Sequence, residues 1–278
     1  MQNSRVTLIT GCSSGISRKL ALKLKERGHH VYAGGNRWES VKTLKDLGIT
    51  PIELDLESTE QCNEAVETIV KAEGRLDVLV NNTCGGLIGP LIELDDAQIE
   101  HELSASIHSI LRMVRPASQP MIQQHSGLIV NVGSLSGILV TPFSGMYCAS
   151  KAAVHALSDA LRMELAPFHI NVMTVQPNTE QTGGHNHSVR AQTSTQRRGS
   201  RYALIEKSIS SCGTSKKQEA DCVDVFCTAL AETIQDAPET AVFRHGFDGY
   251  ATPILAGWTP TRIRDWWLRR QYSLHKLK

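Results

Sequence analysis

The sequence predicts an α/β fold in which one parallel sheet carries helices on both faces. Short apolar runs of strand length alternate with segments of helix length from residue 6 to residue 175. This alternation is typical of parallel sheets in which each strand is followed by a crossover helix. The chain has 278 residues, 41% of them hydrophobic, which suits one domain with a large buried core. We therefore expect a single-domain, doubly wound fold of the Rossmann type.

The expected elements follow one another in a regular order. Residues 6–10 form the first strand, and the next helix has Ile16, Leu20 and Leu24 on one face and ends at Gly28. Further strands are expected at 31–33, 52–54, 76–80, 127–132 and 170–175. Further helices are expected at 38–47, at 59–73, twice within 95–124, and at 147–166.

Two segments depart from this alternation. Residues 178–218 are polar and are expected to form a long substrate loop with one short helix, because loops of this length in compact domains are usually functional. Residues 246–278 combine tryptophans with arginines and lysines. We therefore expect a domain over residues 1–245 and a tail over residues 246–278. The tail suits a membrane surface, a lid over an apolar pocket or a subunit contact.

Charge, cysteine content and hydropathy exclude several classes of protein. The 29 basic and 28 acidic residues nearly cancel, so no nucleic-acid partner is expected. Seven scattered cysteines without a CxxC pair indicate reduced thiols, and neither a disulfide framework nor a metal site is expected. We also expect no signal peptide and no membrane-spanning helix. These features predict a cytoplasmic protein.

The segment TGCSSGIS (residues 10–17) has the pattern of a phosphate-binding turn. It joins the first strand to the first helix and contains Gly11 and Gly15, which would let the backbone approach a ligand closely. Amide groups at the start of the helix would bind a pyrophosphate. Ser17 stands where a third glycine is expected. Because glycine-rich turns also occur without ligands, this motif alone leaves both interpretations open.

Basic residues near the second strand indicate which cofactor would bind. That strand ends in YAGGNR (residues 32–37), which offers Arg37 and no carboxylate, and Arg18 follows the glycine loop. A carboxylate would bind the ribose hydroxyls of NAD, whereas an arginine accommodates the 2′-phosphate of NADP. We therefore expect NADP(H); the alternative is that both arginines are merely solvated.

Ser134, Tyr147 and Lys151 form the most specific pattern in the chain. Tyr147 and Lys151 are four residues apart and share one helix face. An ammonium group near a phenol lowers the pKa of the phenol, so Tyr147 would exchange protons near neutral pH. Ser134 follows a strand at the carboxyl edge, where open α/β sheets bind ligands. Its hydroxyl could hold a substrate carbonyl oxygen.

With these motifs, residues 5–182 resemble the classical short-chain dehydrogenase/reductase (SDR) family. The resemblance rests on TGCSSGIS, Asp55, NNTCGG (81–86), Ser134, YCASK (147–151), and Pro177 with Thr182. It implies that Tyr147 is the general acid and base, that Ser134 polarises the carbonyl and that Lys151 binds the nicotinamide ribose. The implied catalytic set is Ser134, Tyr147, Lys151 and Ser106.

The same resemblance implies a cofactor site. Asp55 would contact the adenine, Asn81 would hold the turn on the cofactor side, and Thr182 would contact the carboxamide region. The full implied set is Gly11, Ser13, Ser14, Gly15, Ile16, Arg37, Asp55, Leu56, Asn81, Tyr147, Lys151, Pro177 and Thr182. Within the family, residues 127–168 and the tail are similar to fungal 1-acyldihydroxyacetone-phosphate reductases and related ketoreductases.

Several positions depart from the family pattern. Ser17 replaces the third glycine, and Thr83 with Cys84 replaces the usual Ala-Gly pair. Ser106 stands where a helix asparagine normally supports a water relay to the lysine, and Asn178 replaces a glycine. Serine is readily accepted near a helix start, and asparagine tolerates left-handed backbone. These departures bear on cofactor affinity and on the proton relay.

We expect NADPH-dependent reduction of a ketone on an apolar, lipid-like or secondary-metabolite substrate. Basic residues within 183–217 would favour an anionic group on that substrate, or they form a solvated loop. One alternative is a repurposed fold that catalyses a cyclisation or isomerisation without redox chemistry. Another is a protein that binds NADP(H) without turnover. The resemblance also implies a homo-oligomer, a dimer or tetramer, formed through the helix that carries Tyr147.

Overall fold

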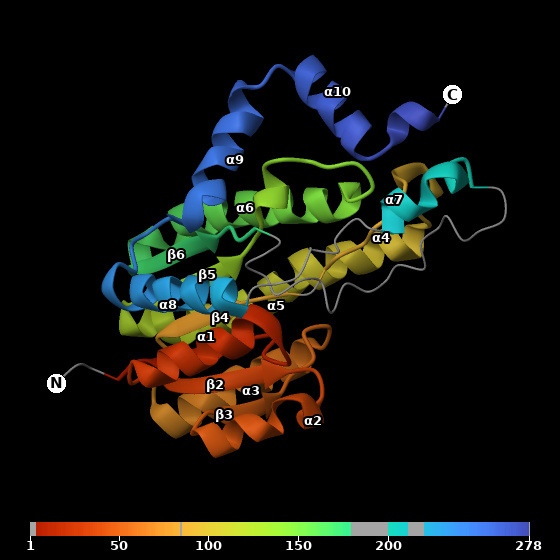
Figure 1. Cartoon of the computed structure of the whole chain (residues 1–278). Helices are drawn as coiled ribbons and strands as arrows, with labels where there is room; N and C mark the ends of the chain where they lie inside the picture. Colours follow the sequence, from red (N-terminus) through yellow and green to blue (C-terminus); the bar gives the residue numbers. More distant parts are fainter. Residues whose placement is uncertain (1–3, 84, 179–199, 211–219, 278) are drawn as a thin grey trace.

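The structure is a computed structural model that describes residues 4–83, 85–178, 200–210 and 220–277. Within these residues the centre is a seven-stranded parallel sheet in the order β3-β2-β1-β4-β5-β6-β7 (Figure 1). The strands are β1 (Val6–Ile9), β2 (His30–Gly35), β3 (Thr50–Glu53), β4 (Val78–Asn81), β5 (Gly127–Val132), β6 (Ile170–Val175) and β7 (Val242–Phe243).

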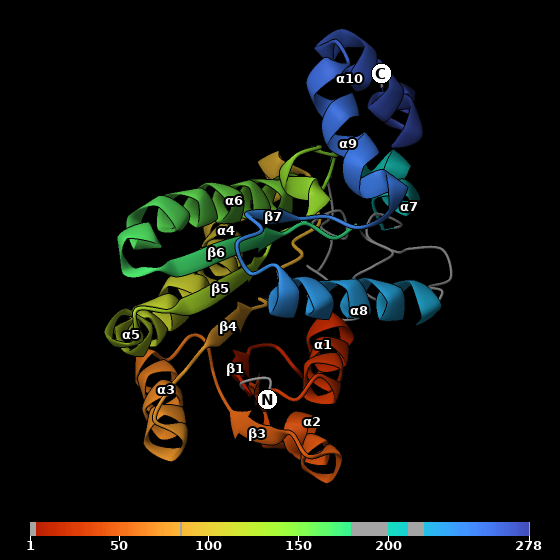
Figure 2. The same cartoon turned by 90° about the vertical axis from the view of Figure 1, so that its left-hand side faces the viewer.

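Helices cover both faces of the sheet (Figure 2). One face packs against α1 (Gly15–Glu26), α2 (Trp38–Val41) and α8 (Ala220–Asp236). The other packs against α3 (Thr59–Glu73), α5 (Ser109–Gln124) and α6 (Gly145–Leu165). Successive side chains of a strand alternate between the two cores: Leu128 and Val130 of β5 face the first, and Ile129 the second. This burial on both faces explains the continuous apolar runs, and the predicted doubly wound fold is confirmed.

The strand order creates a crevice at the carboxyl edge of the sheet. The chain builds β1, β2 and β3 outward in one direction and then returns to β4, which pairs with the other side of β1. Loops that follow β1 and β4 therefore diverge to opposite faces. Such a switch point is where open α/β sheets bind their ligands. The glycine loop and the NNTCGG segment flank this point.

Most elements lie near the positions that the periodicity predicts. The helix expected at 38–47 is α2 followed by a 3₁₀ segment over Lys42–Leu47, and the strand expected at 76–80 is β4 at Val78–Asn81. β3 begins and ends earlier than expected, at Thr50 and Glu53. The two helical stretches expected within residues 95–124 are α4 (Asp96–Leu103) and α5, joined without a break by a π-helical turn over Ser104–His108. Sequence periodicity did not predict α8 and β7.

The C-terminal segment stands above the carboxyl edge (Figure 1). It consists of α9 (Gly246–Trp258), α10 (Thr261–Gln271) and a 3₁₀ turn over Leu274–Lys276. Arg264 Nη1 donates to the carbonyl of Ala256 at 3.2 Å, which ties α10 to α9. Beneath it, a third cluster centres on Phe143, Ile205 and Ile209, and Tyr272 packs against it. The tail thus rests on the loop side of the domain.

Part of the expected substrate loop is described. Residues 203–210 form a 3₁₀ turn (Ala203–Ile205) followed by the short helix α7 (Glu206–Ser210). Thr182, Cys84 and most of the basic loop residues lie outside the described residues. No helix among the described residues has the length and hydropathy needed to span a bilayer.

Candidate active site

The predicted set of Ser134, Tyr147 and Lys151 is brought together at the end of β5. Ser134 follows β5, while Tyr147 and Lys151 lie one turn apart on α6. All three are buried, at 5%, 8% and 3% exposure. Lys151 Nζ lies 5.8 Å from the centre of the Tyr147 ring and donates to the carbonyl of Val132 at 3.1 Å. This hydrogen bond orients the ammonium toward the carboxyl edge of the sheet.

His155, which sequence reasoning missed, supports the Ser134 turn. The Ser134 amide donates to His155 Nε2 at 3.4 Å, and Ser134 Oγ accepts from the Ser136 amide at 3.1 Å. Burial, and secondarily the charge of Lys151, lower the pKa of His155 to about 4. The imidazole is therefore neutral at physiological pH, and its free nitrogen can accept a hydrogen bond. The signal in the sequence is the i, i+4 spacing of His155 from Lys151.

The glycine loop has the geometry of an anion site. Gly11 has φ +71°, and a Cβ there would lie 2.6 Å from the carbonyl oxygen of Asn82. Gly15, at φ +64°, begins α1. The first amides of a helix have no intrahelical acceptor. The Ser14 side chain makes no capping hydrogen bond to those of α1. Ser13 Oγ lies 3.0 Å from Ser40 Oγ. This open helix start fits a pyrophosphate.

Ser17, which replaces the third glycine of the family pattern, forms a hydrogen bond through its side chain. It is fully buried, and its hydroxyl accepts from Asn82 Nδ2 at 2.8 Å. The amide of Asn82 in turn donates to Thr10 Oγ1 at 2.9 Å. The glycine loop is thereby tied to the segment after β4. Asn82, which was not predicted as a site residue, thus links Thr10 and Ser17 to the segment after β4.

Asn81 instead links strands to the helix of Tyr147. Its Nδ2 donates to Asn131 Oδ1 at 2.9 Å, and Asn131 Nδ2 donates to Ser158 Oγ on α6 at 3.0 Å. The expected role of Asn81 at the cofactor-side turn stays a prediction beside these contacts. Two buried oxygens near the crevice, Asn81 Oδ1 and Thr83 Oγ1, lack a hydrogen-bond partner. Buried polar atoms are usually satisfied, so these two fit a polar ligand that enters the crevice.

The outer end of the crevice combines two cations with two carboxylates. Arg37 is exposed just after β2, while Arg18 donates to Thr43 Oγ1 at 2.9 Å and so lies beside the α2 segment. Glu53, at the end of β3, accepts from the amide of Trp38 at 3.2 Å. Asp55 Oδ1 accepts from the amide of Glu57. The carboxylate missing from β2 is thus present one strand away, on Glu53.

The remaining predicted residues have these environments. Ser106 is fully buried in the π-helical turn, and its hydroxyl lies 3.5 Å from Glu102 Oε1. Its hydroxyl donates to Glu102, and its role in a water relay to Lys151 stays a prediction. The Pro177 carbonyl accepts from the Leu135 amide at 3.0 Å, which places Pro177 beside the Ser134 turn. The Leu56 carbonyl accepts from Arg112 Nη1.

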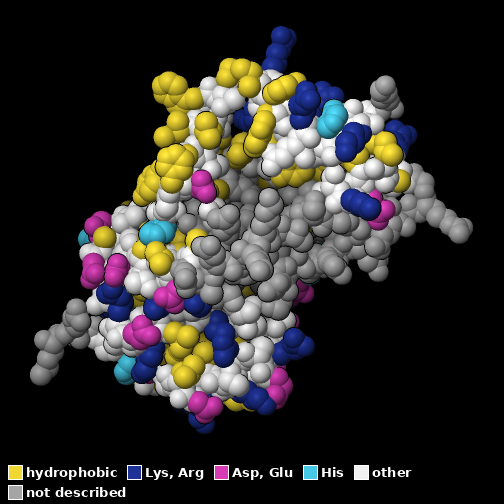
Figure 3. Space-filling view, viewed as in Figure 1, with side chains coloured by type: hydrophobic (Ala, Val, Ile, Leu, Met, Phe, Trp, Pro, Cys, Tyr) yellow, Lys and Arg dark blue, Asp and Glu magenta, His cyan; other side chains and the backbone are white. Residues whose placement is uncertain are grey.

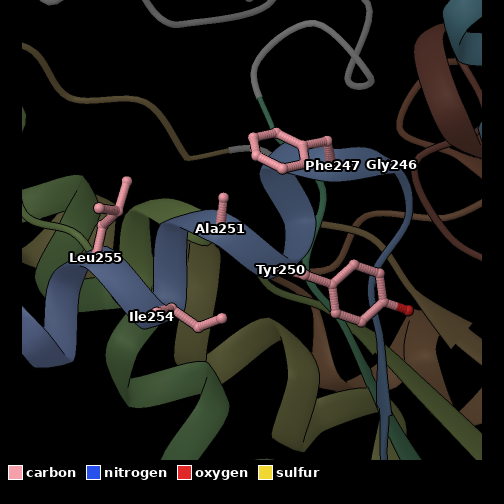
Figure 4. A pocket seen from close by; sticks show the side chains of 6 residues that line it. All are labelled: Gly246, Phe247, Tyr250, Ala251, Ile254 and Leu255. Carbon is pink, nitrogen blue, oxygen red and sulfur yellow. The ribbon is translucent and has the colours of Figure 1, made fainter.

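An apolar hollow lies on α9, next to the crevice side of the tail. It has a volume of about 560 Å³, and Figure 4 shows the side chains that line it: Gly246, Phe247, Tyr250, Ala251, Ile254 and Leu255. All six residues come from one helix, so the hollow is an open surface feature and not an enclosed pocket. Phe247 is 84% exposed.

Together, the doubly wound sheet, the open glycine loop and the buried tyrosine–lysine pair define a class of dinucleotide-dependent oxidoreductases. The chain belongs to the short chain dehydrogenase family, whose model matches residues 5–193. Curated relatives match at 33–39% identity over 178–189 residues, and the matches span 55–66% of the relatives' own lengths. The predicted family is confirmed.

Individual relatives include enzymes and solved structures. An NADPH-dependent 1-acyldihydroxyacetone phosphate reductase of Schizosaccharomyces pombe is 34% identical over 184 residues, which are 66% of this chain and 62% of that relative. The NADP-bound structure of ElxO aligns with a TM-score of 0.61 and 31% identity, covering 63% of this chain and 73% of its own. A short-chain dehydrogenase from Streptomyces avermitilis aligns over 99% of both chains with a TM-score of 0.76 and 22% identity, which supports the fold alone.

Proposed function

We propose that the protein reduces a ketone to an alcohol, with Tyr147 as the proton donor. The observation that carries this proposal is the burial of Ser134, Tyr147 and Lys151 together at the carboxyl edge of the sheet. Ser134 Oγ would donate to the substrate carbonyl oxygen and Tyr147 would protonate it as charge develops there. Lys151 would supply the positive charge that favours release of the phenolic proton. The bound nicotinamide would supply the hydride.

We propose NADP(H) as the cofactor. The residues fit a dinucleotide, because the first amides of α1 are open and Thr83 Oγ1 is buried without a partner. Arg37 and Arg18 lie near the end of β2, where a 2′-phosphate would be accommodated. The NADP-bound ElxO and the NADPH-dependent yeast reductase support this preference. Glu53 is the one observation that points the other way, because a carboxylate at this position would favour NAD over NADP.

The decisive experiment replaces Tyr147 with Phe. NADPH should still bind, measured by cofactor fluorescence, while turnover on a ketone panel falls by about 10²- to 10⁴-fold, as expected for a lost general acid. Tyr32→Phe is the matched control, because its hydroxyl bonds Glu73 in the core and lies outside the site. Near-normal NADPH oxidation by Tyr147→Phe would refute the assignment. Product formed without NADPH oxidation would instead indicate a cyclisation or isomerisation, and tight binding without turnover a cofactor-binding protein.

The substrate is proposed to be apolar, and the tail to contact a membrane. Eight large exposed apolar side chains lie on α9 and α10: Phe247, Tyr250, Ile254, Leu255, Trp258, Ile263, Trp266 and Trp267. Figure 3 shows these apolar side chains gathered over the tail beside basic ones. Residues 246–277 contain five arginines and lysines against two aspartates. An apolar face with tryptophans and flanking cations suits an anionic lipid surface.

Vesicle sedimentation tests this contact. The protein should sediment with vesicles of phosphatidylcholine and phosphatidylserine at low salt, and Trp258→Ser with Trp266→Ser should reduce the bound fraction. Trp38→Ser is the matched control, since Trp38 is exposed on the opposite end of the fold. Equal vesicle binding by the Trp258→Ser, Trp266→Ser double variant and by Trp38→Ser would contradict the proposal. Loss of a dimer in the double variant would instead indicate that the tail forms a subunit contact.

We also propose a homo-oligomer formed through α6. Ala149, Ala152 and Ala156 are exposed along one side of this helix, so a second copy could approach closely. Light scattering should report a dimer or tetramer, and Ala152→Arg should shift it toward the monomer. A monomeric wild-type protein would contradict this part of the proposal.

A further inference from the structure

Glu102 is a buried carboxylate with no role in the mechanism proposed above. It lies near the end of α4 and is 3% exposed. A buried carboxylate is strongly unfavourable unless hydrogen bonds replace its hydration. Charged residues are rare in protein cores unless they are paired. The hydrogen-bond partners of Glu102 therefore indicate which segments it holds in place.

The carboxylate of Glu102 connects three separate segments. Its Oε2 accepts from the amides of Gly86 and Leu87, at 2.9 and 3.0 Å, in the segment that follows β4. Its Oε1 accepts from Ser150 Oγ on α6 at 2.9 Å and lies 3.5 Å from Ser106 Oγ in the π-helical turn. Both carboxylate oxygens therefore accept hydrogen bonds, Oε2 from the segment after β4 and Oε1 from α6.

Two of these three segments border the candidate active site. The segment after β4 forms one side of the switch-point crevice, where the cofactor is proposed to bind. Ser150 directly precedes Lys151, and its Oγ also lies 2.9 Å from the carbonyl oxygen of Tyr147. The carboxylate thus spans the space between the cofactor side and the proton-donor side of the crevice.

Packing around Glu102 leaves it little freedom. A Cβ on Gly85 would overlap Glu102 Oε1 and would lie 2.8 Å from Ser106 Oγ. Glycine at position 85 therefore provides the space that lets the carboxylate reach its donors. The residue pair Gly85 and Glu102 supplies two independent ways to disturb the same contact.

We propose that Glu102 is a positioning residue that ties the cofactor wall to the catalytic helix and so sets the distance between hydride donor and proton donor. This inference rests on the proposed reductase function for its kinetic consequence, but its structural part does not. Reaction rates depend steeply on such distances, and a displacement of about 1 Å can lower a rate by about 10²-fold.

The experiment compares Glu102→Ala, Glu102→Gln and Gly85→Ala with the control Glu100→Gln. Glu100 lies on the same helix but is exposed, so the control removes a charge without disturbing the buried contact. Glu102→Gln keeps an oxygen for the two amides and should retain most activity. Glu102→Ala and Gly85→Ala should lower kcat by about 10-fold or more, with a smaller change in substrate KM.

Two readouts are independent of turnover. Hydrogen exchange at the Gly86 and Leu87 amides should accelerate in Glu102→Ala and Gly85→Ala, and NADPH should bind more weakly to both. Ser150→Ala should leave these amides protected while still lowering kcat, because it severs the link to α6 alone. If Glu102→Ala fails to fold, Gly85→Ala and Ser150→Ala decide the question.

The outcomes separate the two proposals. Unchanged kcat, exchange and NADPH affinity in both Glu102→Ala and Gly85→Ala would overturn the positioning role, whatever the wild-type activity. A wild-type protein without ketone reduction, but with faster exchange and weaker NADPH binding in these variants, would overturn the reductase function and retain the positioning role.

Discussion

Ser17 and Thr83 both replace residues of the family pattern, yet their environments differ. Ser17 is buried and paired with Asn82, so the extra hydroxyl stabilises the loop around the crevice. Thr83 is also buried, but its hydroxyl has no partner. An unmade buried hydrogen bond destabilises a fold unless a ligand completes it. The first substitution is therefore structural, and we infer that the second serves binding.

Thr83→Ala should separate stability from binding. The variant loses the desolvation penalty of the unpaired hydroxyl but also a buried methyl group, so the free energy of unfolding should change by no more than about 1 kcal/mol. NADPH affinity should fall at the same time. Chemical denaturation and cofactor fluorescence measure the two effects, and Thr59→Ala on the exposed start of α3 is the control. Unchanged affinity would remove Thr83 from the proposed cofactor site.

One buried histidine, His29, and one half-buried histidine, His155, predict a loss of stability in acid. Burial is the main cause that lowers the pKa of His29 and of His155 to about 4 in the folded protein, against an ordinary value of 6.5. Between these values the unfolded chain binds protons that the folded chain does not. Stability is therefore complete above pH 6.5 and falls as pH drops toward 4, by about 2 kcal/mol for each histidine.

Urea denaturation between pH 7.5 and pH 4.5 measures this loss. His155→Gln should flatten the pH dependence, because the neutral amide can still accept from Ser134 and does not titrate. His108→Gln, at an exposed position, is the matched substitution for comparison. An equal slope in wild type and His155→Gln would show that His155 does not contribute.

At the scale of elements, the helix that best matches its prediction is α3. Ser58 precedes it and accepts from the amide of Gln61 at 3.2 Å, and Gly74 follows it at φ +71°. Start and stop signals therefore lie within a few residues of the apolar pattern, where a sequence can be interpreted directly. Helices α4 and α5 lack such signals at their junction, because the π-helical turn carries the chain on without a cap.

Ser58→Ala should destabilise the protein through the start of α3 alone. The lost cap is expected to lower the free energy of unfolding by about 1 kcal/mol. Thermal or urea unfolding measures the effect. Glu64→Ala, at an exposed position inside the same helix, should be nearly neutral; a similar loss there would point to helix propensity instead of the cap.

At the scale of the whole molecule, α8 joins distant parts of the chain. It packs against α1, the helix that begins at the glycine loop, and Arg27 of the α1 terminus forms an ion pair with Glu232 at 2.8 Å. Phe226 of α8 is fully buried, and its ring lies 5.5 Å from that of Phe243 in β7. Residues more than two hundred positions apart thus support the same side of the crevice.

Phe226→Ala should therefore affect stability and cofactor binding together. Loss of a large buried ring is expected to lower the free energy of unfolding by about 3–5 kcal/mol. Weaker NADPH binding should accompany it, because α1 loses its backing helix. Val225→Ala is the control, since Val225 is exposed on α8. Intact affinity in a folded Phe226→Ala protein would show that α1 is held by the sheet alone.

Local patterns were sufficient for much of this protein. Residues 127–132 and 170–175 are apolar throughout because their strands are buried on both faces, and the glycine loop, Ser134, Tyr147 and Lys151 follow element ends that the periodicity locates. The sequence by itself therefore determined the doubly wound fold, the family and the main candidate residues. These features depend on residues close together in the chain.

Tertiary structure decided what depends on distant contacts. The buried carboxylate of Glu102, the support of Ser134 by His155 and the pairing of Ser17 with Asn82 all join residues from different elements. Apart from the spacing of His155 from Lys151, no local pattern marks these contacts. A glutamate on a helix is ordinarily solvated, and Glu102 holds segments together only because the fold brings their donors to it. Hydrogen-bond partners of buried polar groups are a property of the folded arrangement.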